Sequence, residues 1–263
     1  MKLFDSHCHI DDQAYDQDRK AVIENAIKSN VCGMMVVSIT EDSAKKAVQI
    51  ASEYPQCYAS VGIHPHDAKA CSENVLSVLT ELCQHPRVKA WGETGLDFNR
   101  MYSSQSDQEK WFIRQLEIAQ EHNMALIFHE RDSKGRFLEI LKSYDPVERK
   151  GVVHCFSGSK KELKAYLDLN YEIGITGILT LKQRGDDLRR MVTYIPKERI
   201  LIETDAPYLT PFPEKKKNRR NEPAFVRSTF NKLCDIHTSD PHELAKTIWD
   251  TTCRLFDIMD HRA

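Results

Sequence analysis

The segment Arg199-Ile200-Leu201-Ile202-Glu203-Thr204-Asp205 joins an unbroken apolar run to two carboxylates. Such a run is typical of a strand that is buried on both faces, as the strands of parallel sheets are. Seven more short apolar runs alternate with amphipathic helical patterns, and they cover residues 2–4, 33–39, 58–63, 88–93, 125–129, 151–156 and 171–175. Eight strand–helix units in one chain predict a (β/α)8 barrel, the TIM-barrel fold of the α/β class.

The main alternative is an open, doubly wound sheet. No Gly-x-Gly-x-x-Gly motif follows a predicted strand, so the nucleotide-binding form of that fold has no support. The 263 residues contain no internal repeat and no linker, and α/β barrels reach this length as one unit. We therefore expect a single domain over residues 1–263, with residues 210–223 as its longest irregular segment.

Composition and charge restrict the classes of function. The chain has 37 Lys and Arg against 39 Asp and Glu, a net charge of −2, so any nucleic-acid contact must depend on local basic residues. The first residues lack an apolar signal region, and no stretch approaches the ~18 apolar residues of a membrane span. The eight cysteines include no Cys-x-x-Cys pair and are expected to be reduced thiols. We expect a cytoplasmic, monomeric protein that does not bind membranes.

The first predicted strand ends in the motif His7-Cys8-His9. Because side chains alternate along a strand, His7 and His9 face one way and Cys8 faces the other. Two imidazoles on one face can hold a metal ion, although chance pairs of this kind are common. Cys8 is expected to pack in the core rather than to bind the ion.

Polar residues end six of the eight predicted strands, and the carboxyl ends of barrel strands form the active-site mouth. Glu93 ends the fourth run, where its two oxygens can bridge two cations. His129 and His154 end the fifth and sixth runs, although a single histidine there is more often a satisfied core residue. Glu203 and Asp205 lie on one face of the eighth run, where two buried acids need cations or donors. This convergence predicts a metal site.

Nitrogen and oxygen ligands without thiolate favour Zn, Mn, Co, Fe or Mg over a structural thiolate zinc site. A divalent ion lowers the pKa of bound water and makes hydroxide available at neutral pH. Asp205 is placed to accept the proton of that water. The predicted class of reaction is therefore hydrolysis.

Cations near the same mouth indicate a substrate that bears phosphate. Arg131 lies two residues after His129 and can clamp a phosphate, with a salt bridge to a loop acid as the alternative. His64, in His64-Pro65-His66, can hydrogen-bond to an anionic substrate, whereas His66 is as readily an ordinary loop histidine. The basic segment, residues 215–220, is either a solvated loop or a contact for a nucleic-acid backbone. Its five cations are Lys215, Lys216, Lys217, Arg219 and Arg220. No interleaved aromatic platform favours base recognition.

The chain resembles the TatD family of metal-dependent deoxyribonucleases, within the amidohydrolase-like barrel superfamily. The resemblance runs from residue 4 to about residue 256 and is specific as an ordered set of motifs rather than through any one of them. The motifs are Asp5-Ser6-His7-Cys8-His9, Gly62-Ile63-His64-Pro65-His66, Gly92-Glu93-Thr94-Gly95-Leu96-Asp97, His129-Glu130-Arg131-Asp132, His154-Cys155-Phe156-Ser157-Gly158 and Glu203-Thr204-Asp205-Ala206-Pro207-Tyr208-Leu209.

The resemblance implies a TIM barrel that holds one or two divalent ions, with Mg, Mn or Zn as candidates. The implied ligands are His7, His9 and Asp205 for one ion, His129 and His154 for the other, and Glu93 as the bridge between them. His64 and Glu203 would lie near the scissile phosphate and the attacking water. The implied activity is hydrolysis of DNA phosphodiester bonds by an exonuclease that works from the 3′ end, on a single strand or a 3′ terminus.

One departure from the family concerns the rim of the mouth. Many members carry a short Arg-Gly-Lys element before the position of Asn221, where this chain has Glu214 and the basic segment. Two other functions remain as alternatives. A barrel of the same fold can hydrolyse another ester or an amide, such as a D-aminoacyl-tRNA, because one activated water serves both reactions. A barrel without activity can serve as a binding protein, but the intact ligand set argues against it.

Overall fold

The computed structural model describes residues 1–144 and 149–259, and it confirms the predicted barrel. All eight predicted strands are present, and they form one parallel sheet in chain order. The strands are β1 (Leu3–Cys8), β2 (Val31–Val36), β3 (Cys57–Val61), β4 (Val88–Asp97), β5 (Ala125–Arg131), β6 (Gly151–Val153), β7 (Glu172–Ile175) and β8 (Ile200–Ile202).

The sheet closes because the chain beyond β8 returns to β1. Cys8 pairs with Ala206 in parallel, and the His9 amide donates to the Ala206 carbonyl at 2.7 Å. The Asp5 carboxylate accepts from the backbone N–H and the hydroxyl of Thr204 at 2.9 and 2.6 Å. These contacts place the segments that follow the first and last strands side by side at one rim of the barrel.

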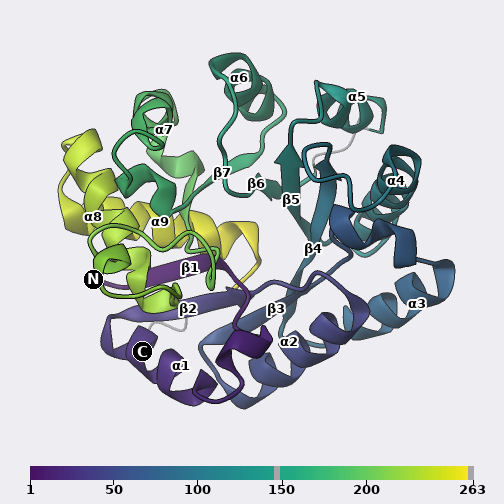
Figure 1. The fold of residues 1–263 in the computed structure, drawn as a ribbon, viewed down its shortest axis with the longest axis horizontal. Helices are drawn as coiled ribbons and strands as arrows, with labels where there is room; N and C mark the ends of the chain where they lie inside the picture. The colour runs from purple at the N-terminus through teal and green to yellow at the C-terminus, as the bar shows by residue number, and fades with distance from the viewer. Residues whose placement is uncertain (145–148, 260–263) are drawn as a thin grey trace.

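Helices surround the strands in a ring, which Figure 1 shows. Within the described residues they are α1 (Arg19–Lys28), α2 (Glu41–Glu53), α3 (Glu73–Leu82), α4 (Gln105–Glu121), α5 (Arg136–Ser143), α6 (Lys160–Asp168), α7 (Asp186–Val192), α8 (Val226–His237) and α9 (Pro241–Leu255). Helix α2 begins at a capping box of Thr40 and Ser43, and its predicted apolar stripe is buried. No described helix is both long and apolar enough to cross a membrane.

Alternate strand residues pack in two separate apolar layers. Met35 and Ile127 belong to the layer inside the barrel, whereas Met34 and Phe128 belong to the layer between the strands and the helices. Phe256, which follows α9, joins the interior layer. The interior is therefore a packed core, and chemistry is confined to the rim formed by the carboxyl ends of the strands.

Three strand ends differ from the prediction in ways that bear on the site. Strands β4 and β5 continue to Asp97 and Arg131 because they stay paired over four further positions, from Thr94–Phe128 to Asp97–Arg131. Strand β8 ends at Ile202, so Glu203 and Asp205 lie beyond it. The backbone of Asp205 has a φ of 56°, and the simple alternation that places the two acids on one face does not apply there.

Candidate metal centre

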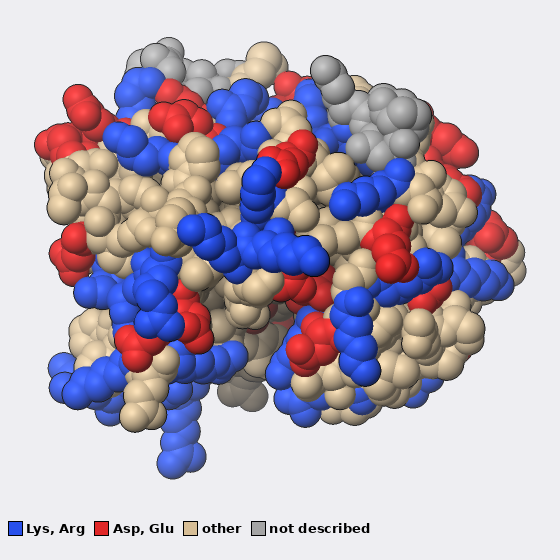
Figure 2. All heavy atoms as spheres, turned by 90° about the horizontal axis from the view of Figure 1, so that it is seen from above, with Lys and Arg blue, Asp and Glu red and all other residues tan. Residues whose placement is uncertain are grey.

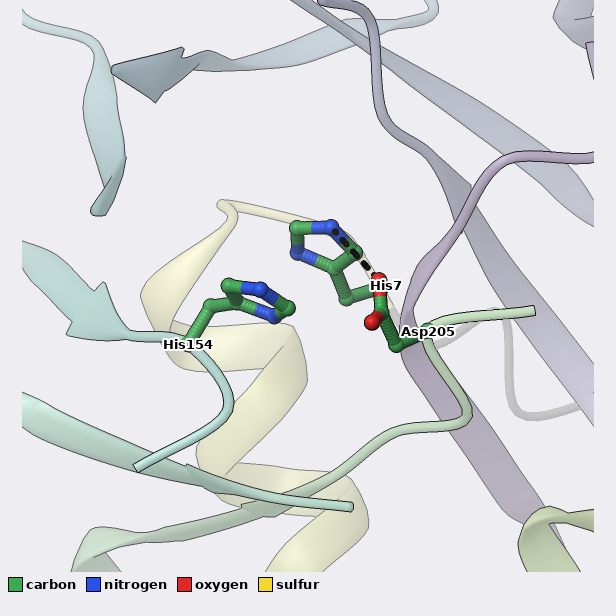
Figure 3. A group of neighbouring side chains, drawn as sticks. All are labelled: His7, His154 and Asp205. Carbon is green, nitrogen blue, oxygen red and sulfur yellow. Dashed lines mark ion pairs between the residues drawn. The ribbon is translucent and has the colours of Figure 1, made fainter. Parts of the chain in front are cut away.

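The structure brings the predicted metal ligands together at the rim of the barrel. Their positions are the end of β1 for His7 and His9, β4 for Glu93, β5 for His129, the residue after β6 for His154 and the segment after β8 for Asp205. Figure 3 shows His7, His154 and Asp205 directed toward one another from three separate segments. The strand ends thus supply side chains that are far apart in sequence to one small volume.

The first donor group consists of His7 Nε2, His9 Nε2, Glu93 Oε2 and Asp205 Oδ1. The two histidine nitrogens are 3.2 Å apart, and Glu93 Oε2 lies 3.4 Å from His7 Nε2. Asp205 Oδ1 lies 3.4 Å from His9 Nε2. Two donors that bind one divalent ion at about 2.1 Å each are about 3.0–3.4 Å apart. This group therefore fits a single divalent ion.

The second donor group consists of Glu93 Oε1, His129 Nδ1 and His154 Nε2, and His64 Nε2 lies beside it. Glu93 Oε1 lies 2.7 Å from His129 Nδ1, 3.4 Å from His154 Nε2 and 3.5 Å from His64 Nε2. The two oxygens of Glu93 thus face two different groups of donors. This arrangement fits a carboxylate shared between two ions, as the resemblance implies for Glu93.

Charges within the two groups are strongly coupled. Burial favours the neutral forms of Glu93 and Asp205, but the neighbouring histidines outweigh it and hold the pKa of both carboxyls below its ordinary value. Burial also disfavours protonation of His9, yet the hydrogen bond with Asp205 raises the pKa of this imidazole to about 10. The bonds of His129 with Asp97 and Glu93 likewise overcome burial and raise its pKa to about 9. Without a metal ion, protons on histidines therefore balance the buried carboxylates.

The histidines are held by partners on the side away from the donor groups. His9 Nδ1 lies 2.8 Å from the Val37 carbonyl, and His154 Nδ1 lies 3.1 Å from Glu203 Oε1. Such partners fix the tautomer and the orientation of a metal-binding imidazole.

Glu203 differs from the position that the resemblance implies. Its carboxylate is fully buried behind His154, where it also accepts the Cys155 N–H at 2.5 Å. The Cβ that any other residue would add at Gly174 would lie 2.5 Å from Glu203 Oε2, so the glycine leaves the room that the carboxylate occupies. The described contacts of Glu203 Oε1 are thus with His154 and the backbone of Cys155.

The sequence pattern predicts no role for Asp97 and leaves open whether His66 is an ordinary loop histidine. Asp97 Oδ2 lies 3.2 Å from His129 Nε2 and 2.8 Å from His66 Nε2. The signal that identifies Asp97 is alternation along β4, because positions 93, 95 and 97 share a face. That signal was missed because the predicted strand ended at Glu93.

The residues predicted to contact phosphate differ in exposure and in their partners. Arg131 is exposed and makes no ion pair with a described residue. In the basic segment, Lys215, Lys216, Lys217 and Arg219 are also exposed. Arg220 departs from the prediction, because it forms two hydrogen bonds with the Asp18 carboxylate and a third with Glu222. The protein's own acids thus neutralise Arg220, whereas the other cations of the basic segment stay accessible. Figure 2 shows Lys and Arg interspersed with Asp and Glu over one whole face, in keeping with the small net charge.

A parallel barrel with histidines and a shared carboxylate at the carboxyl ends of its strands is the architecture of the metal-dependent hydrolases of the TIM-barrel class. Residues 4–257 match the model of the family described as TatD related DNase. The chain belongs to this family.

Individual relatives agree with this assignment. The chain is 38% identical over 263 residues to the "3'-5' ssDNA/RNA exonuclease TatD" of Rahnella sp. (strain Y9602), with 99% of this chain and 100% of the relative covered. It is 35% identical over 259 residues to the protein of the same name from Salmonella typhimurium, with 98% and 100% covered. Among solved structures, the TatD homolog YJJV from Escherichia coli k12 superposes with a TM-score of 0.90 at 27% identity and covers 98% of each chain.

Proposed function

We propose that this protein is a metal-dependent nuclease that hydrolyses phosphodiester bonds of single-stranded nucleic acid from the 3′ end. The observation that carries the proposal is Glu93, whose two oxygens face two donor groups that each fit a divalent ion. Membership of the TatD related DNase family and the names of the curated relatives support phosphodiesters as the substrate. We further propose that two ions are held, from among Mg, Mn and Zn.

Divalent ions held by these groups supply a water of lowered pKa and Lewis-acid polarisation of the phosphoryl oxygens. Asp205 is ionised and 15% exposed, whereas Glu93 is only 3% exposed. Asp205 is therefore the carboxylate that a water molecule at the mouth can reach, and we assign to it the acceptance of the proton from the attacking water. Glu203 and Asp97 act through His154 and His129, whose rings they hold in place.

His64 is better suited to contact the substrate than to bind an ion. Burial lowers the pKa of its imidazole well below the ordinary value, so the ring is neutral at neutral pH. Its Nδ1 accepts the His66 backbone N–H at 3.0 Å, which leaves the ring proton on Nε2. Nε2 lies 3.5 Å from Glu93 Oε1, so its N–H can donate to a phosphate oxygen bound beside the second donor group. This supports the predicted hydrogen bond from His64 to the scissile phosphate.

The test is hydrolysis of end-labelled single-stranded DNA by the purified protein after it has been stripped with a chelator. We expect added Mg, Mn or Zn to restore cleavage, and the position of the label to show shortening from the 3′ end. Asp205→Ala should be inactive with every ion, whereas Asp168→Ala, which removes an exposed carboxylate at the end of α6, should match the wild type. A parallel assay with single-stranded RNA tests the wider substrate range.

A protein that binds the ions but cleaves neither DNA nor RNA would contradict the proposal. The ester of a D-aminoacyl-tRNA would then be the next substrate to assay, because the same donor groups can activate water against it.

A further inference from the structure

Two tyrosines at the mouth expose more of their surface than any other described aromatic residue. Tyr102, in the loop after β4, and Tyr208, in the segment after β8, are each 55% exposed. Single exposed aromatic rings are common on protein surfaces, so what distinguishes these two rings is their position beside the polar site. These two rings are therefore candidates for contact with a ligand.

The two rings lie on opposite sides of the metal centre. Strands β4 and β8 are four positions apart in a nearly closed barrel of eight strands, so the loops that follow them lie across the mouth from each other. The Tyr102 ring is 4.8 Å from the His66 ring, next to the second donor group. The Tyr208 ring is 6.2 Å from the His9 ring, which belongs to the first donor group. One tyrosine therefore borders each donor group.

Hydrogen bonds anchor the chain that carries each ring. Ser103, next to Tyr102, donates through its hydroxyl to the His66 carbonyl at 2.8 Å and accepts the Lys69 N–H at 3.0 Å. The Tyr208 N–H donates to the Asp205 carbonyl at 2.8 Å, and the Tyr208 carbonyl accepts from Asn221 Nδ2 at 2.6 Å. A backbone anchored in this way before the substrate arrives loses little conformational entropy on binding.

We propose that Tyr102 and Tyr208 are stacking platforms for two nucleobases, one on each side of the phosphodiester at the metal centre. The proposal rests on the proposed nuclease function and adds the residues that select the form of the substrate. Bases of a duplex already stack on each other, so an isolated ring gains contact only with the unstacked bases of a single strand.

Exposed cations lie close to each tyrosine in the chain or at the neighbouring strand end. Arg100 precedes Tyr102 by two residues, and Arg131 is the last residue of β5, next to the end of β4. On the other side, the basic segment follows Tyr208 in the chain. A strand that crosses the mouth from one ring to the other thus passes basic residues at both ends, which suits its anionic backbone.

The test compares binding and cleavage of an ordinary oligothymidylate with one that carries abasic residues at its two 3′-terminal positions. Binding is measured by fluorescence anisotropy with phosphorothioate versions, which resist hydrolysis, on the metal-loaded protein. We expect Tyr102→Ala and Tyr208→Ala each to raise Kd and KM for the ordinary strand by about 5- to 100-fold. Tyr102→Phe and Tyr208→Phe should stay within about twofold of the wild type, because the ring and not the hydroxyl makes the contact.

The control is Tyr194→Ala, which removes a ring that is 52% exposed and has the Lys160 ammonium 3.6 Å from its centroid. It should change neither constant. Metal content and unfolding temperature, measured on every variant, report whether the metal centre and the fold are intact.

The abasic strand separates stacking from a structural effect. The wild type should bind the abasic strand about as weakly as the alanine variants bind the ordinary strand. In the alanine variants, the change from the ordinary to the abasic strand should raise Kd only slightly further. An equal loss on both strands in the variants, or no loss on either, would overturn the proposal. If the wild type cleaves no nucleic acid, the proposed function fails, but the phosphorothioate Kd values still decide whether the two tyrosines bind bases.

Discussion

Asp97 holds His129 without facing either donor group itself. Its second oxygen, Oδ1, accepts the backbone N–H groups of Asn99 and Arg100, both at 2.9 Å. These bonds and those with His129 and His66 hold the pKa of the Asp97 carboxyl far below its ordinary value, although burial opposes the shift. A permanently ionised carboxylate in this position keeps the Nε2 proton on His129 and so leaves Nδ1 free to bind an ion.

Replacing Asp97 by asparagine should therefore weaken metal binding about 10- to 100-fold and lower activity at limiting metal, because His129 loses its anionic partner. Saturating metal should restore part of the activity. Titration of the chelator-stripped protein with Mn or Zn measures the affinity. Asp132→Asn removes an exposed carboxylate in the next loop and is the matched control. Unchanged affinity in Asp97→Asn would show that Asp97 serves folding alone.

The raised pKa values of His9 and His129 predict how metal binding depends on pH. Both imidazoles are protonated at pH 7.5 in the metal-free protein, with pKa values of about 10 and about 9, and both must release the proton to bind an ion. We expect binding at pH 7.5 to release about two protons and the affinity to rise with pH. Calorimetric titration in two buffers of different ionisation enthalpy counts the protons, and a count of zero would contradict the coupling.

The same shifts fix the sign of the pH effect on the metal-free protein. A pKa that is raised in the folded state contributes stability below the ordinary histidine value of 6.5, and this contribution is lost as pH rises through the folded value. Metal-free protein should therefore lose stability between about pH 6.5 and 10.

Strand β4 depends on glycine where it passes His129. Gly95 has a φ of 148°, and a Cβ built there would lie 1.9 Å from the His129 carbonyl oxygen. Only glycine permits both this backbone conformation and the close pairing with β5. Gly95 thus allows β4, which carries Glu93 and Asp97, to pair closely with β5 next to the metal centre.

Gly95→Ala should destabilise the protein by more than about 2 kcal/mol, because the methyl group forces β4 away from β5. Gly135→Ala is the control, since Gly135 also has a positive φ but has no atom within 4 Å of the added Cβ. Its cost should be about 1 kcal/mol, from backbone strain alone. Urea unfolding measures both values. If both variants lose the same unfolding free energy, backbone strain alone, and not the close approach to His129, would explain why position 95 requires glycine.

The basic segment divides into a structural and an exposed part. Arg220→Ala breaks the pair with Asp18, which flanks α1, and should lower the stability by about 0.5–1 kcal/mol. Replacing Lys215, Lys216 and Lys217 by Glu should leave stability unchanged but weaken binding of single-stranded DNA, more at low salt than at high salt. Thermal melts and anisotropy titrations over a salt series measure the two effects. A loss of affinity that does not vary with salt would return these lysines to an ordinary solvated loop.

The metal centre joins parts of the barrel that are distant in sequence. Its donors come from β1, β4 and β5 and from the segments after β6 and β8. Ions held by all of these elements stabilise only the folded protein, because the unfolded chain does not bring the donors together.

Removal of the ions by a chelator should therefore lower Tm by about 5–10 °C, the shift expected when about 2.7 kcal/mol of binding free energy is lost. Readdition should restore Tm in the wild type. Glu93→Gln should show little response to either treatment, because its neutral side chain is a poor bridge. A Tm of the wild type that is insensitive to the chelator would show that the donors bind no ion in the folded protein.

Local patterns predict the strands, their order and the histidines of the candidate metal centre. Apolar runs, helical stripes and the alternation of His7 with His9 depend on neighbours within a few residues, so they can be predicted without a structure. The ends of β4 and β5 could not, because the last paired positions are held by the partner strand and not by their own apolar character.

Closure of the barrel decided everything that depends on residues far apart in the chain. Because the barrel closes, the two oxygens of Glu93 face different donor groups, and Glu203 lies behind His154. Closure also places the loops that carry Tyr102 and Tyr208 on opposite sides of the mouth. Arg220 likewise donates a hydrogen bond to Asp18, which is 202 positions away in the sequence. A residue's partners at such separations are fixed by the path of the whole chain, and local periodicity carries no information about them.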